Sequence, residues 1–168
     1  MRKGFTMIEL IFVIVILGVL ASVAIPRLAA TRDDAEVAKA ATNLSTAVSD
    51  LAAYYTAQGD FKKAGTGTNA VRQTATLTDM TNALDDILGL KGYIKVKSVK
   101  CLSVEAKEST ANASAMITID KDNAGNNENA CKSLLKMNGV KNMCGVAINA
   151  SAATMPCNIT IGGTGVNF

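Results

Sequence analysis

The stretch that decides the fold is MRKGFTMIELIFVIVILGVLASVAIP, residues 1–26. From Phe5 to Ile25 it contains one charged side chain, Glu9, and a helix of that length spans about 31 Å, which matches the hydrocarbon core of a bilayer. Arg2 and Lys3 precede the apolar run and are expected to hold that end in the cytoplasm. The sequence therefore predicts a membrane-spanning helix with the rest of the chain outside the cytoplasm.

Glu9 is unusual because it places a charge inside this apolar helix. An ionised carboxylate within a membrane segment costs on the order of a few kcal/mol unless it finds a partner, so such residues usually have a function. The residues just before Pro26 do not form a convincing small-residue cleavage site for a signal peptidase. We therefore expect the apolar segment to stay attached.

The amino terminus resembles the type IV prepilin signature of type IV pilins and type II secretion pseudopilins, through MRKGFTMIEL followed by IFVIVILGVLASVAIP. That family has a short basic leader, a glycine before the cut, an N-methylated phenylalanine and a glutamate five residues into the mature chain. The resemblance covers about residues 1–32. It implies that prepilin peptidase removes residues 1–4 after Gly4, that Phe5 becomes the methylated terminus, and that Glu9 serves assembly.

The amine of Phe5 and the carboxylate of Glu9 could neutralise one another between neighbouring subunits in an apolar bundle. The alternative is an interfacial glutamate that snorkels to the headgroups, as in an ordinary signal anchor. Gly18 and Pro26 are helix breakers, at a position where assembled pilins of the family often lose helical structure. We expect a helix in the isolated subunit and a non-helical stretch in the fibre.

An amphipathic helical pattern follows Pro26. Apolar residues recur at spacings of three and four on one side of residues 27–58, and Gly59 is a plausible stop. These seam residues are Val37, Ala41, Leu44, Val48, Leu51 and Tyr55. One long helix from about Phe5 to Gln58 is therefore predicted, with an apolar half over 5–26 and an amphipathic half over 27–58. The seam could pack on a globular head or form a coiled-coil dimer.

Residues 59–168 are predicted to form that head. A polar excursion over 59–78 precedes a short helix that Thr78 caps and Gly89 closes. Strand patterns are expected around 94–96, 102–106 and 113–119, with KESTAN as a hairpin loop, then a helical turn over 131–137, and a terminal pair of 145–148 with 158–161. The fold class is therefore α+β, with a small antiparallel sheet packed on the long helix, in agreement with the pilin fold that the resemblance implies.

Four cysteines in the last part of the chain indicate an oxidising compartment and two disulfides. They are Cys101, Cys131, Cys144 and Cys157, and they contain no CxxC pair suited to zinc. All three pairings stay open, with Cys144–Cys157 slightly favoured. A loop closed by that pair would resemble the carboxy-terminal loop of pilins.

Two further clusters have a functional and a plain interpretation. The loop DKDNAGNNE could hold calcium through Asp120, Asp122, Asn123 and Glu128, although it is not an EF-hand, and a solvated polar loop is the plain interpretation. Four lysines could form a basic patch, with Lys95 and Lys97 on one face of a strand, or could protect a sheet edge from aggregation. The patch lysines are Lys91, Lys95, Lys97 and Lys100. No other cofactor is expected.

Composition argues against enzymatic chemistry and no catalytic residue is predicted. The chain lacks histidine, the usual general base and commonest metal ligand, and its net charge of +3 does not imply nucleic acid as a partner. The resemblance implies a pilus subunit that starts in the inner membrane and ends at the cell surface. Its partners would be copies of itself, prepilin peptidase and an inner-membrane assembly platform. The alternatives are a pseudopilin in a periplasmic filament and a signal-anchored periplasmic enzyme or binding protein.

Overall fold

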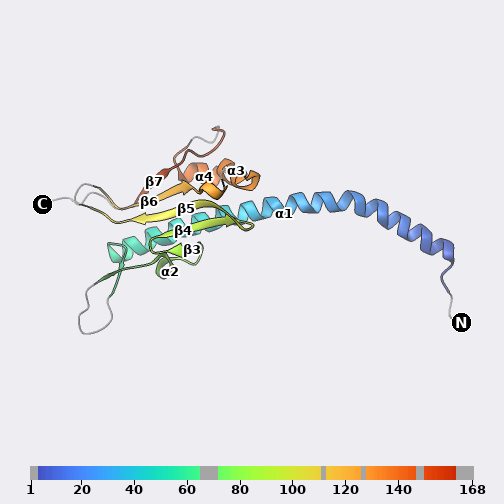
Figure 1. The fold of residues 1–168 in the computed structure, drawn as a ribbon, viewed down its shortest axis with the longest axis horizontal. Helices are drawn as coiled ribbons and strands as arrows, with labels where there is room; N and C mark the ends of the chain where they lie inside the picture. The colour runs from blue at the N-terminus through green and yellow to red at the C-terminus, as the bar shows by residue number, and fades with distance from the viewer. Residues whose placement is uncertain (1–3, 65–71, 111–112, 126–127, 147–149, 162–168) are drawn as a thin grey trace. The chain divides into compact units, whose positions relative to one another are not determined.

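The computed structural model describes residues 4–64, 72–110, 113–125, 128–146 and 150–161. The chain divides into two compact units, Met1–Ala35 and Glu36–Phe168. Helix α1 (Met7–Gln58) runs without interruption through the end of the first unit and into the second (Figure 1). It ends as expected at Gly59, which has a φ of +79° and donates its N–H to the carbonyl of Tyr55 at 2.7 Å.

The second unit contains a five-stranded antiparallel sheet in the order β3-β4-β5-β6-β7 (Figure 1). The first four strands form a meander, and β7 pairs with β6 after the chain has passed through helices α3 and α4. The strands are β3 (Asp85–Leu88), β4 (Lys91–Val96), β5 (Val99–Lys107), β6 (Met116–Lys121) and β7 (Cys157–Thr160). The remaining elements are β1 (Lys62–Lys63), β2 (Gln73–Thr74), α2 (Leu77–Met80), the 3₁₀ turn η1 (Asn123–Gly125), α3 (Asn129–Lys136) and α4 (Asn138–Met143).

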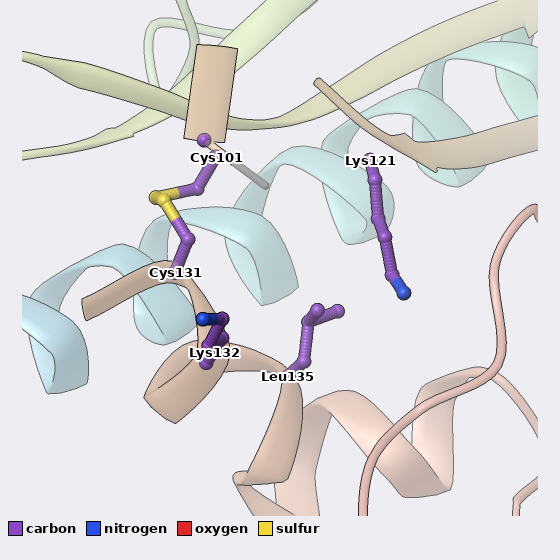
Figure 2. A pocket seen from close by; sticks show the side chains of 6 residues that line it. Cys101, Lys121, Cys131, Lys132 and Leu135 are labelled. Atoms are coloured by element: carbon purple, nitrogen blue, oxygen red, sulfur yellow. A yellow bond between two sulfur atoms is a disulfide. The ribbon is translucent and has the colours of Figure 1, made fainter. Parts of the chain in front are cut away.

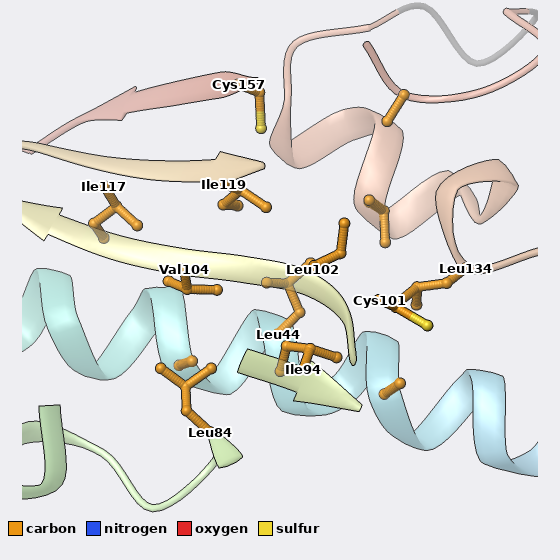
Figure 3. Close-up of a cluster of buried hydrophobic side chains, with 14 of the residues drawn as sticks. Leu44, Leu84, Ile94, Cys101, Leu102, Val104, Ile117, Ile119, Leu134 and Cys157 are labelled. Carbon is orange, nitrogen blue, oxygen red and sulfur yellow. The ribbon is translucent and has the colours of Figure 1, made fainter. Parts of the chain in front are cut away.

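The core of this unit lies between the sheet and the second half of α1. Figure 3 shows Leu44 of α1 against Ile94 and Leu102 of the sheet, and all three side chains are almost wholly inaccessible to solvent. The buried α1 residues are Val37, Ala40, Leu44, Ala47 and Leu51. Of the predicted seam, Val37, Leu44 and Leu51 are buried, and Ala41, Val48 and Tyr55 are partly buried against the same core, so the seam packs on its own chain. The expected α+β class, with an antiparallel sheet, is confirmed.

The predicted helix from Thr78 to Gly89 is wrong. Only α2 is helical there, and its start lies two residues earlier because Asp79 accepts hydrogen bonds from the N–H and hydroxyl of Thr76, at 2.8 and 2.9 Å. It stops at Thr81, which is extended and buried, with its hydroxyl donating to Asp50 on α1 at 2.7 Å. Residues 85–88 then pair with β4, and Gly89, with a φ of +61°, forms part of the hairpin turn.

Other strand boundaries also differ from the prediction. Lys97 is not on β4 but in the turn after it, with a φ of +58°, so it does not share a strand face with Lys95. Ala113 forms an isolated bridge with Thr110, and β6 begins only at Met116. Residues 158–160 pair with β6 instead of with 145–148, of which 147–148 lie outside the described residues. The predicted helical turn over 131–137 is present as α3.

Asp79, the carboxylate that caps α2, is expected to make a contribution to folding stability that is lost in acid. Hydrogen bonds from the Thr76 backbone and from Lys63 lower the pKa of Asp79 from 3.8 to about 2. Because the folded pKa is depressed, the stability it contributes is complete above pH 3.8 and is lost as the pH falls towards 2. We expect Asp79→Asn to lower the melting temperature at pH 5, with a difference from wild type that shrinks by pH 2. Asp34→Asn, an exposed carboxylate on α1, is the control and should not reproduce that pH profile.

Candidate functional site

The amino-terminal part of α1 is an apolar segment whose side chains are exposed. The segment Met7–Ile25 has 19 residues, a mean hydropathy of 2.9 and no buried residue, and by length and composition it could cross a membrane. Phe5 is 87% exposed and Phe12 67% exposed. Apolar surface on this scale is stable only in lipid or against other protein chains.

The helix begins with a capping box made by Thr6 and Glu9. The Glu9 carboxylate accepts hydrogen bonds from the N–H and the hydroxyl of Thr6, at 2.8 and 2.6 Å, and the Glu9 N–H approaches the Thr6 hydroxyl at 3.4 Å. Glu9 is therefore held by its own chain close to residue 5. Sequence reasoning missed Thr6, although the spacing Thr-x-x-Glu before an apolar run is a recognised sign of a helix start.

The expected processing point lies just before this cap. Gly4 and Phe5 are exposed and non-helical, and no atom lies within 4 Å of the position that a Gly4 side chain would take. A peptidase needs an accessible backbone outside a helix, because a helical peptide bond is hydrogen-bonded within the helix. The local structure therefore leaves the bond between these two residues open to cleavage.

The two helix breakers lie inside α1. The helix continues through Gly18 and Pro26, and a side chain added at Gly18 would meet nothing within 4 Å. Since proline has no N–H, the carbonyl of Ser22 lacks its usual helical donor. The segment between the two residues is therefore the part of the apolar helix that is easiest to unwind.

Two disulfides attach helices α3 and α4 to the sheet. One joins Cys144, at the end of α4, to Cys157, the first residue of β7, and the other joins Cys101 on β5 to Cys131 on α3. No cysteine is free. The disulfides therefore link α3 to β5 and the end of α4 to β7, the two strands that flank β6.

Gly125 packs against the Cys101–Cys131 disulfide so closely that there is no room for a side chain. A Cβ there would meet the carbonyl oxygen of Lys100 at 2.5 Å and the sulfur of Cys131 at 2.8 Å. We expect Gly125→Ala to destabilise the fold by about 2 kcal/mol, because the backbone must move to relieve the overlap. The control is Gly139→Ala in α4, where nothing lies within 4 Å of a Cβ and no loss is expected. Denaturant unfolding compares the two, and equal stabilities would contradict this account of Gly125.

The calcium hypothesis gains no support from the described residues. Asp120 accepts a hydrogen bond from the backbone N–H of Lys121 at 2.8 Å, while Asp122 donates its own N–H to the carbonyl of Cys101 at 3.1 Å. Asn123 begins η1 and Glu128 is the residue before α3. In the described ranges, no three His, Cys, Asp or Glu side chains gather as a metal site. Calcium binding stays an untested prediction.

Three lysines of the predicted basic patch contact an acidic or an aromatic side chain of their own chain. Lys95 and Lys100 form ion pairs with Asp86 at 2.8 and 3.0 Å, and their hydrogen bonds lower the pKa of Asp86. The ammonium groups of Lys100 and Lys91 lie over the ring of Tyr93, at 4.3 and 5.7 Å from its centre. Lys91 and Lys95 lie on β4 and Lys100 on β5, which are both internal strands of the sheet, so these contacts satisfy the lysines within the chain and do not place them on an edge strand.

Together these features describe an α+β protein with an amino-terminal helix that is long and apolar enough to cross a membrane, and with a sheet to which two disulfides attach helices α3 and α4. Residues 1–25 match the prokaryotic N-terminal methylation motif, and the chain thus carries the signature of type IV pilins and pseudopilins. The fold is consistent with the pilin fold. Comparison with curated proteins and with solved structures gives no match.

Proposed function

We propose that this protein is a structural subunit of a type IV pilus, processed by prepilin peptidase and polymerised through its amino-terminal helix. The observation that carries the proposal is the fully exposed apolar segment Met7–Ile25 directly behind the methylation motif. Before assembly the segment lies in the inner membrane with the head outside the cytoplasm. In the filament the same surface is buried against copies of itself. The apolar segment therefore moves from lipid to protein contacts without being exposed to water.

Glu9 supplies the electrostatic part of this assembly. Cleavage after Gly4 leaves Phe5 with a new amino group, one residue before the Thr6 cap that holds the Glu9 carboxylate. An incoming subunit can place its carboxylate against that amine of a neighbour, and the charged pair makes each group tolerable in an apolar bundle. The leader must be removed first, because residue 5 has no free amine in the precursor.

The second candidate is a pseudopilin of a type II secretion system. The motif is common to both classes, and the pilus is favoured because the loop closed by Cys144–Cys157 resembles the carboxy-terminal disulfide loop of pilins. A signal-anchored enzyme or binding protein is a third candidate. It is disfavoured because the chain has no histidine to act as a general base.

Shearing experiments test the proposal. We expect the protein in the sheared extracellular fibre fraction, detected by mass spectrometry, at levels well above those of an inner-membrane control protein. Recovery only from a periplasmic filament would favour the pseudopilin, and recovery only as a membrane monomer would favour an anchored enzyme or binding protein.

The helix breakers predict a change of structure on assembly. In lipid, a free backbone group costs several kcal/mol, so α1 stays helical through Gly18 and Pro26. In the filament, neighbouring subunits replace lipid and the chain between them can extend, rising about 3.3 Å per residue instead of 1.5 Å. We expect a filament map from cryo-electron microscopy to show non-helical backbone there. A continuous helix across residues 18–26 would show that the breakers are only tolerated.

A further inference from the structure

A small surface cavity lies beside the Cys101–Cys131 disulfide. Its volume is about 150 Å³, and its lining combines the disulfide and Leu135 with two lysines and Gly125. Figure 2 shows the disulfide, Lys121 and Leu135 around this space, with Lys132 beside them on α3. Cys101, Cys131 and Leu135 are each less than 9% exposed, so they form a rigid apolar floor that belongs to the core.

Two lysines line this cavity, Lys121 on β6 and Lys132 on α3. Lys121 and Lys132 are exposed, and no ion pair between described residues includes either of them. This distinguishes them from Lys95 and Lys100, which share the carboxylate of Asp86. An apolar floor with two ammonium groups at its side is suited to a ligand with one apolar end and one anionic end.

We infer that this cavity binds small apolar monocarboxylates. A cavity of about 150 Å³ lined by apolar groups can hold a ring the size of benzene, and the carboxylate would then lie between the ammonium groups of Lys121 and Lys132. Gly125, which lacks a Cβ, lets the backbone pack directly against the disulfide and so fixes that wall of the cavity. An inorganic anion would gain only the charge contacts, and a neutral ring only the apolar ones.

Benzoate is the probe that tests this inference. The full-length protein in detergent micelles is titrated with benzoate, and the methyl resonances of Leu135 are followed by NMR. We expect saturable shifts with a Kd on the order of 1 mM, as is usual for so small a ligand. Lys121→Met and Lys132→Met should each weaken binding about threefold, the effect expected of an exposed ion pair, and the double variant about tenfold.

Two control ligands and one control variant distinguish binding in this cavity from nonspecific binding to the protein surface. Benzyl alcohol has the ring without the charge, inorganic phosphate has charge without the ring, and both should bind more weakly than benzoate. Lys136→Met removes a lysine of α3 that does not line the cavity and should leave the Kd unchanged. The inference is overturned if the Leu135 signals do not saturate, if benzyl alcohol binds as well as benzoate, or if the double variant, still folded by circular dichroism, binds like wild type.

Discussion

Replacing Glu9 by alanine should leave the protein in the inner membrane and remove it almost completely from sheared filaments. The apolar segment becomes more hydrophobic, so membrane insertion is unaffected or improved. What is lost is the one carboxylate between Phe5 and Ile25, which the proposed assembly pairs with the amine of a neighbouring Phe5. An amine buried without its partner costs several kcal/mol per subunit contact, and this cost recurs along the whole filament.

Two comparisons isolate the charge from other effects of this change. Glu9→Gln keeps a side chain of similar size that can still accept from Thr6, so it should retain the helix start but fail in assembly. Ser22→Ala alters another polar side chain of the apolar segment, whose hydroxyl donates only to the carbonyl of Val19, and should assemble normally. Immunoblots of membrane and sheared fractions measure both. Normal filament yield from either Glu9 variant would contradict the proposed pairing.

Removing the Cys144–Cys157 disulfide should destabilise the head by about 3 kcal/mol, the chain-entropy value for a loop of this length. For a unit of this size, that lowers the melting temperature by about 10 °C. The double change Cys144→Ser/Cys157→Ser avoids a leftover thiol. We expect limited proteolysis to begin near the carboxyl end, because β7 is then attached to the sheet only by its pairing with β6.

The other disulfide is the matched control for this experiment. Cys101→Ser/Cys131→Ser opens a larger loop, with a sequence separation of 30 against 13, and should cost at least as much stability. Its first proteolytic cuts are expected around α3 instead of β7. An unchanged melt in the Cys144→Ser/Cys157→Ser variant would refute the structural role assigned to that loop.

Sequence reasoning worked best where one physical signal dominated. The apolar run before Pro26 and the seam through Leu44 and Leu51 predicted α1 to within two residues, because helical periodicity over many turns is hard to mistake. The strands at Ile94 and Leu102 followed from the alternation of apolar and polar residues in the sequence.

Prediction failed where tertiary contacts outweighed local preference. Residues 83–88 have helical spacing, yet Thr81 is drawn to Asp50 on α1 and the following residues complete the sheet edge beside β4. Residues 59–78 were expected to be a polar surface excursion, yet Phe61 is fully buried and its N–H donates to Glu108 at 3.1 Å. Partners this distant in sequence leave no local pattern to read.

The residues proposed for processing and assembly come from the sequence and stay predictions. Glu9 stood out because a carboxylate in an apolar run has few plain explanations, and the motif gave Gly4 and Phe5 their expected roles. The cavity beside Cys101–Cys131 could not be foreseen, because Lys121 and Leu135 meet only once α3 has folded back on β5 and β6.

The central claim is that the chain is cleaved after Gly4 and polymerises through the helix that then begins at Phe5. Mass spectrometry of the amino-terminal peptide from purified filaments tests it most directly. We predict a peptide that begins with N-methylated Phe5 and lacks residues 1–4. Filaments that contain the protein with residues 1–4 still attached, or filaments that lack the protein altogether, would contradict the account.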